Sequence, residues 1–193
     1  MTATFLLLTA ATENKWKREF LEMMTYKGDF YWTNYFMWKE RVTEFFEKHP
    51  TAKPATALHV LATVGDSSHY LKETTDFLIS MIDKIDDLLV KDESGSTLLA
   101  NAVRHGKEWL IRSLIEKNKE LLADEHQDHL HLLLTTVPDA NEKIPVQLAC
   151  ESGNKDITQF LYIETPSHIL HPEKGELGFH LIKDCISKKM FGK

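Results

Sequence analysis

A ten-residue string that ends in glycine recurs along this chain, and the recurrence constrains the fold more than any other feature. The copies are residues 56–65 (TALHVLATVG), 97–106 (TLLANAVRHG) and 144–153 (IPVQLACESG). Each opens with a β-branched residue, carries apolar residues on one helix face, and has small residues where another helix must approach. Such self-similarity predicts stacked helical units of one kind.

The copies fit the TPLHxAAxxG signature of an ankyrin repeat, whose uninterrupted period is about 33 residues. The final glycines of consecutive copies are 41 and 47 residues apart. The apolar pairs of the helices that follow the first two copies nevertheless begin at Phe77 and Leu110, which are 33 residues apart. We therefore expect an eight-residue insertion near 66–73 and a 14-residue insertion within 123–138. The second insertion is predicted to be a solvated loop that can be deleted from 123 to 136.

The fold class predicted by this pattern is all-α, an ankyrin-repeat solenoid of helix-turn-helix units with short turn tips. The N-terminal region, residues 1–50, is expected to be a helical cap or a degenerate repeat, and residues 5–14 and 24–30 fit its opening helix equally well. Repeats are expected over residues 51–193, at about 51–91, 92–139 and 140–172, with an incomplete unit at 173–193. All six prolines fall at proposed helix boundaries or tips, which supports these positions.

Composition excludes several classes of partner. The net charge is -6, with 23 basic and 29 acidic residues and no long basic block, so nucleic acid is not an expected partner. No apolar run reaches the length of a membrane span, and the N-terminal apolar stretch lacks the basic start of a signal peptide. The two cysteines, Cys150 and Cys185, fall on the inner-helix pattern and are expected to be buried thiols of a cytosolic protein.

No set of residues in the sequence predicts catalysis. His126, His129 and His131 form the only metal-like cluster, but no cysteine is near and the cluster lies in the longer insertion. A nucleophile and base could be sought in Cys150 with His59 or His105, yet all three lie inside the repeated strings and have structural roles there. We therefore expect no enzyme, no cofactor and no metal. A metal-dependent enzyme that uses the three histidines is the weakest alternative.

A protein-binding surface is expected on the turn tips and on the exposed side of the helices that carry the repeated string. Its predicted residues are Thr63, Val64, Asp92, Ser94, Asn101, Arg104, Glu142, Lys143, Glu151 and Ser152. Arg104 and Glu151 are predicted to project from these helices without any packing role. The aromatic cluster Tyr31, Trp32, Tyr35, Phe36 and Trp38 could serve an interface, but we favour a cap over the first repeat.

Five segments resemble plant ankyrin-repeat proteins of the accelerated-cell-death and salt-tolerance type. They are 45–50 (FFEKHP), 56–59 (TALH), 92–99 (DESGSTLL), 114–122 (LIEKNKELL) and 152–166 (SGNKDITQFLYIETP). The resemblance extends over about residues 21–187. It implies a module of stress or defence signalling, in a family whose members usually carry a multi-span membrane domain after the repeats.

These patterns together predict a noncatalytic module that binds other proteins, with a rigid surface that loses little entropy on association. The resemblance implies a cytoplasmic location, with association to the cytosolic face of a membrane only through a partner. The alternative is a truncated, nonfunctional fragment of a membrane-anchored signalling protein, because the incomplete last unit ends before a second helix.

Overall fold

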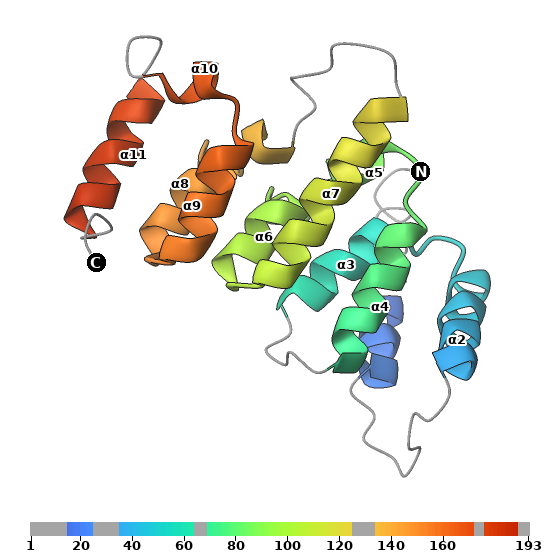
Figure 1. Ribbon diagram of the computed structural model, residues 1–193. Coiled ribbons are helices and arrows are strands. Elements are labelled where there is room, and N and C mark those ends of the chain that lie inside the picture. The colour runs from blue at the N-terminus through green and yellow to red at the C-terminus, as the bar shows by residue number, and fades with distance from the viewer. Residues whose placement is uncertain (1–14, 25–34, 64–68, 125–133, 172–175, 189–193) are drawn as a thin grey trace, which may run out of the picture. The chain divides into compact units, whose positions relative to one another are not determined.

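The computed structural model describes residues 15–24, 35–63, 69–124, 134–171 and 176–188 (Figure 1). These residues are helical apart from turns and short connections, and their only β pairing is an isolated antiparallel bridge between Lys91 and Thr97. The predicted all-α class is therefore confirmed. The chain divides into two compact units, residues 1–81 and 82–193.

Unit 1 contains helical residues 15–24 and the helices α2 (Tyr35–Lys48), α3 (Pro54–Thr63) and α4 (His69–Ser80). Aromatic rings join its first two helices. Phe45 lies 6.4 Å from Trp16 and 5.2 Å from Phe20 between ring centroids, and all three side chains are buried. Rings at such spacings stabilise a core beyond the apolar area that they bury. The sequence analysis did not identify this cluster.

Helix α3 carries the first copy of the repeated string and pairs with α4. Most of its residues are buried, among them Leu58, Leu61 and His59, the histidine of the signature. In α4, Leu78 is fully buried and Phe77 is half-buried. Residues 69–73 of the proposed eight-residue insertion form the start of α4, so that part of the insertion is helical.

Unit 2 is a row of helix pairs. Its elements are α5 (Ile85–Leu88), α6 (Leu98–Arg104), α7 (Glu108–Asp124), the 3-10 helix η2 (Leu134–Thr136), α8 (Pro145–Ser152), α9 (Lys155–Glu164), α10 (Ser167–Leu170) and α11 (Glu176–Ser187). Helix α6 pairs with α7, and α8 pairs with α9; α8 also packs between α6 and α11 (Figure 1). The second and third copies of the string form α6 and α8, which we call the inner helices, whereas α7 and α9 are the outer helices.

The two inner helices end in the same way. Gly106 and Gly153 both have left-handed backbone, with φ of 63° and 78°. The next residue then donates its backbone N–H to a carbonyl five residues earlier, from Lys107 to Ala102 at 2.9 Å and from Asn154 to Ala149 at 3.3 Å. This bond satisfies a carbonyl that the helix end would leave without a donor, and glycine adopts the conformation without strain.

The outer helices bury one apolar stripe each, as their periodicity predicts. The buried apolar residues are Leu110, Ile111, Leu114, Ile115 and Leu121 in α7, and Ile157 and Leu161 in α9. On the outer surface the two helices meet through a cation–π contact and an ion pair: the Arg112 guanidinium lies 4.2 Å from the ring centroid of Phe160, and Lys119 Nζ lies 2.6 Å from Glu164 Oε2.

The end of the longer insertion is not a solvated loop. Leu134 is completely buried and Thr135 is nearly so, and both belong to η2. The buried Asn118 of α7 accepts a hydrogen bond at Oδ1 from the Leu134 backbone N–H, at 3.1 Å. The prediction that residues 123–136 can be deleted is therefore wrong, since the deletion would remove a core leucine at a cost of about 2–5 kcal/mol.

Candidate interaction surface

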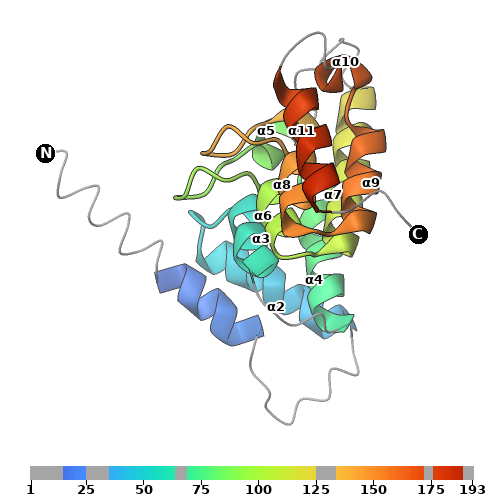
Figure 2. The ribbon, with the colours of Figure 1, turned by 90° about the vertical axis from the view of Figure 1, so that its left-hand side faces the viewer.

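Two turns of the same geometry precede the inner helices of unit 2, and Figure 2 shows them projecting on one side of the helices. The first turn is residues 92–96. Asp92 Oδ1 accepts the backbone N–H groups of Ser94 and Ser96 at 2.8 and 3.0 Å, and Gly95 has a φ of 74°. Aspartate thus replaces backbone acceptors that a sharp turn cannot supply. Thr97 then begins α6, and its hydroxyl accepts the N–H of Ala100.

The second turn, residues 139–143, repeats this arrangement 47 positions later. Asp139 Oδ1 accepts the backbone N–H groups of Asn141 and Lys143 at 2.8 and 2.9 Å. Glu142 occupies the place of the left-handed glycine, with a φ of 60°. Ile144 begins α8 and has no hydroxyl, and the Gln147 backbone N–H donates to the Ile144 carbonyl at 3.0 Å. The Gln147 side chain in turn accepts the Ile144 backbone N–H at 3.1 Å.

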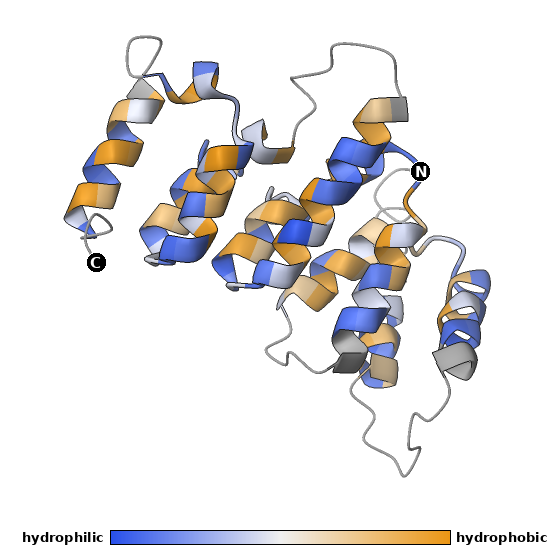
Figure 3. Cartoon of the chain, viewed as in Figure 1, coloured by the Kyte–Doolittle hydropathy of each residue, from blue (hydrophilic) through white to orange (hydrophobic). Residues whose placement is uncertain are grey.

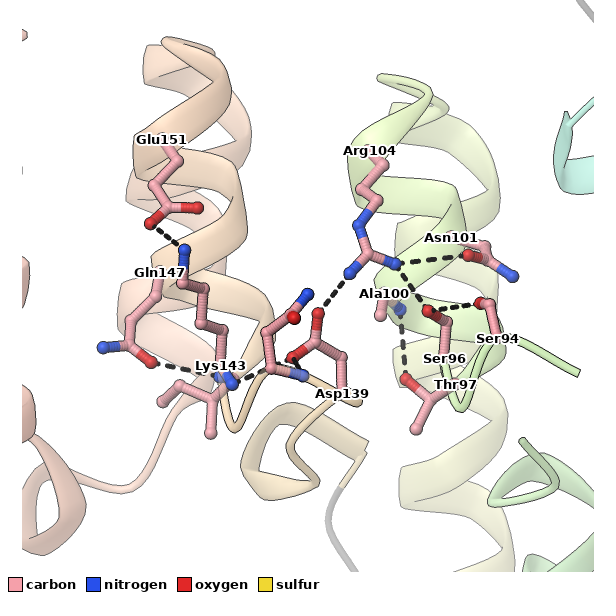
Figure 4. Close-up of polar contacts among 12 residues, drawn as sticks. Ser94, Ser96, Thr97, Ala100, Asn101, Arg104, Asp139, Lys143, Gln147 and Glu151 are labelled. Carbon is pink, nitrogen blue, oxygen red and sulfur yellow. Dashed lines mark hydrogen bonds and ion pairs between the residues drawn. The ribbon is translucent and has the colours of Figure 1, made fainter. Parts of the chain in front are cut away.

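Arg104 of α6 links the two turns (Figure 4). Its guanidinium donates to Ser96 Oγ of the first turn at 2.7 Å and forms an ion pair with Asp139 of the second turn. The Asp139 side chain is completely buried, whereas that of Arg104 is 33% exposed. The turns also touch directly, because a Cβ added at Gly95 would lie 2.9 Å from the Cβ of Ala140. Hence the two neighbouring repeats of unit 2 are joined at their turns.

The carboxylates of both turns are held in the charged form. Burial raises the pKa of Asp92, but hydrogen bonds from Ser94, Asn101 and Ser96 outweigh that effect and lower the pKa to about 2. Burial also raises the pKa of Asp139, and the backbone N–H groups of Lys143 and Asn141 together with the Arg104 charge bring it below its ordinary value. Each turn therefore holds a charged carboxylate, stabilised by neutral hydrogen-bond donors at Asp92 and by Arg104 as well as backbone donors at Asp139.

Two of the predicted surface residues are corrected by these contacts. Asn101 is buried, with 6% of its surface exposed, and donates from Nδ2 to Asp92 Oδ2 at 2.6 Å. Arg104 is tied to both turns, so the prediction that it has no packing role is wrong. Sequence reasoning missed the reason, because Asp139 lies 35 residues away along the chain.

The other predicted residues within the described ranges lie in the turns or on the helices that carry the repeated string. Thr63, Ser94, Glu142 and Ser152 are exposed, Asp92, Lys143 and Glu151 are half-buried, and Val64 lies outside the described residues. Lys143 Nζ contacts Glu151 Oε1 at 2.5 Å, and the hydrogen bond to Glu151 raises the pKa of Lys143. Glu151 therefore ties the second turn to α8.

Asp139 is the residue that sequence analysis overlooked. The predicted surface residues of this turn are Glu142 and Lys143, although the spacing of 47 residues between Thr97 and Ile144 also relates Asp92 to Asp139. Applying that spacing to the whole turn would have found Asp139.

The remaining predicted sites divide into those that the structure describes and those that it does not. His126, His129 and His131, and Tyr31 and Trp32, lie outside the described residues, as do the side chains of the other three clustered aromatics. Both cysteines are buried as predicted, with their Sγ atoms 2.9 Å apart. Burial, followed by the hydrogen bond to Cys185, raises the pKa of Cys150 to about 12, so this thiol is not poised as a nucleophile.

Within the described ranges, no group of three or more metal-binding side chains comes together, and no helix is both long and apolar enough to cross a bilayer. Comparison with known family models, curated proteins and solved structures finds no match to this chain.

Proposed function

We propose that this chain is a noncatalytic ankyrin-repeat module that binds other proteins, in plant stress or defence signalling in the cytoplasm. The observation that carries the proposal is the 47-residue correspondence in unit 2: Asp92 with Asp139, Ala102 with Ala149, and Gly106 with Gly153. The same turn, inner helix and helix end occur twice, which supports a repeated unit with a turn tip.

The joined turns support a binding role. Arg104, Asp139 and the contact of Gly95 with Ala140 fix the positions of the two turns before any partner arrives. A surface that is already ordered loses little conformational entropy on binding. Glu142 and Ser94 are exposed in these turns and so can meet a partner.

A charge reversal at the turn tests this proposal. We would purify protein complexes from plant tissue with the parent chain, with Glu142→Lys and with Glu116→Lys, and quantify each recovered protein by mass spectrometry. Glu116 is exposed on α7 and gives the same charge change away from the turns. Like charges across an interface are costly, so Glu142→Lys should lower recovery of the specific partner at least about fivefold. Equal recovery with both variants would contradict binding at the turns.

A further inference from the structure

The C-terminal end of unit 2 exposes apolar side chains. Among the described residues, the large hydrophobic side chains that are exposed belong to α9 and α11, whose hydrophobic residues appear in orange in Figure 3. Phe179, Ile182 and Ile186 of α11 are 62%, 47% and 62% exposed. Their spacing of three and four residues places them on one stripe of the helix. Tyr162 of α9 is 55% exposed.

The stripe borders a groove of about 530 Å³ between the two helices. Its lining residues are Lys155, Thr158, Gln159, Tyr162, Leu181, Ile182 and Cys185. The lining is mostly apolar, and this face is adjacent to the side of α11 that packs on α8 through Leu181 and Cys185. An apolar groove with a short polar rim is the form of site that receives an amphipathic helix.

In the preceding repeat of unit 2, the place equivalent to this groove is filled by α9. There α9 packs on α8 and meets α7 through Arg112 and Phe160. Helix α11 packs on α8 in the way that α8 packs on α6, but no outer helix of the described residues pairs with it as α9 pairs with α8. The groove therefore continues an interface that the fold already uses, and its occupant should resemble α9.

Charge selects the kind of helix. Lys155 lines the groove at the position that Glu108 has on α7, 47 residues earlier. Lys183 is exposed and flanks the stripe on the side away from Leu181 and Cys185, so it does not line the groove, and Asp184 is on the opposite side of α11 from the stripe. The charged residue that lines this groove is thus the base Lys155, where the earlier groove has a Glu108 carboxylate paired with Arg112. A second copy is disfavoured, because symmetric pairing of this stripe would bring Lys183 close to Lys183 of the other copy.

The geometry points to this groove as the docking site for an amphipathic helix of a partner protein, with branched or aromatic apolar residues on one face and acidic residues beside them. The site is separate from the turns. It uses the exposed stripe and Lys155, and binding completes the helix pair that α11 begins.

A synthetic peptide with the sequence of residues 154–166 tests the proposal, because this segment fits the equivalent place within the fold. The peptide is held helical by a staple between positions 155 and 159 and carries a fluorescent label. In the equivalent pose Asp156 of the peptide would face Lys155 of the chain, so a second peptide with Asp156→Lys reverses that charge. Fluorescence anisotropy with the full chain should show at least about tenfold weaker binding of the second peptide.

Variants of the chain locate the binding. Ile182→Glu should weaken binding of the first peptide at least about tenfold, because it places a carboxylate in the apolar groove. Ile163→Glu is the matched control, since Ile163 is 71% exposed on α9 but does not line the groove. Both exposed positions should retain the parent's helical circular dichroism, and Glu142→Lys should leave peptide binding unchanged.

The remaining outcomes overturn the inference. A groove that selects an acidic helix would be excluded if the first peptide did not bind, or if the two peptides bound equally well. It would also be excluded if Ile163→Glu weakened binding of the first peptide as much as Ile182→Glu does. Sedimentation of the parent chain as a dimer that Ile182→Glu dissociates would show that a second copy is the occupant. A failure of the Glu142→Lys experiment in plant tissue would leave these measurements unaffected.

Discussion

The two turns of unit 2 have one backbone geometry but different connections. In the first turn, Asp92 is bound by Asn101 of the helix that the turn itself begins. In the second turn, Asp139 is bound by Arg104, which belongs to the preceding inner helix. The first turn is bound to the inner helix of its own repeat, whereas the second turn is bound to the inner helix of the preceding repeat. An aspartate that organises a turn can therefore also fix the spacing of repeated units, depending on the side chain that meets its second oxygen.

Charge reversal at Arg104, which binds the second turn to the preceding inner helix, should destabilise the fold most. Arg104→Glu removes the ion pair of a buried carboxylate and places a second carboxylate near it, so we expect a loss of about 3 kcal/mol in the free energy of unfolding. Urea denaturation followed by circular dichroism measures the change. The control is Glu151→Lys beside the half-exposed Lys143, with an expected loss below about 1 kcal/mol. Similar losses in both variants would remove the special role of Arg104.

The second largest effect is expected at Gly95, the residue with left-handed backbone in the first turn, whose counterpart in the second turn is Glu142. Gly95→Ala introduces a side chain at a φ of 74° and brings a Cβ to 2.9 Å from Ala140. Strain and overlap together should cost about 2 kcal/mol, measured by urea denaturation. Stability equal to that of the parent would show that the two turns can move apart freely.

Acid should weaken both turns together. Because the pKa of Asp92 is about 2 in the folded protein and 3.8 is its ordinary value, its contribution is complete above about pH 4 and is lost as the pH falls toward 2. Partial exposure to solvent limits the loss to about 1 kcal/mol. The urea midpoint should fall over this range in the parent and less steeply in Asp92→Asn. Parallel curves would mean that the Asp92 hydrogen bonds do not favour the charged form.

The smallest effect should come from the second turn's own left-handed residue. Glu142→Gly relieves the strain at a φ of 60° but adds entropy to the unfolded chain, so we expect a net gain of about 0.5 kcal/mol. A thermal melt that follows helical circular dichroism has the sensitivity for this change. A lower melting temperature would indicate that the Glu142 side chain stabilises the turn.

Local signals in the sequence predicted much of the fold. The repeated string located α3, α6 and α8, because helix periodicity, small residues and a final glycine all act within a few residues of one another. The outer helices followed from their apolar pairs. The burial of Leu134 did not, since it depends on Asn118 and on a return of the chain after a long connection, which periodicity does not describe.

The candidate surface was predicted in position but not in detail. The positions of both turns were predicted, but the aspartate that organises the second turn, Asp139, was overlooked. The orientation of Arg104 could not follow from its place on the helix, since its partner Asp139 belongs to the next unit. The same holds for Asn101, which looks exposed on a helical wheel but is covered once Asp92 accepts its hydrogen bond.

The contacts along the two rows of helices differ in stiffness. Small buried residues such as Ala102 and Ala149 line the inner row, where close packing resists any change of spacing. The outer row meets at its surface through long side chains, with Lys119 and Glu164 as an ion pair that salt screens. Under tension or at high ionic strength, unit 2 should thus bend in one preferred direction, with its outer edge widening while the inner row acts as the hinge.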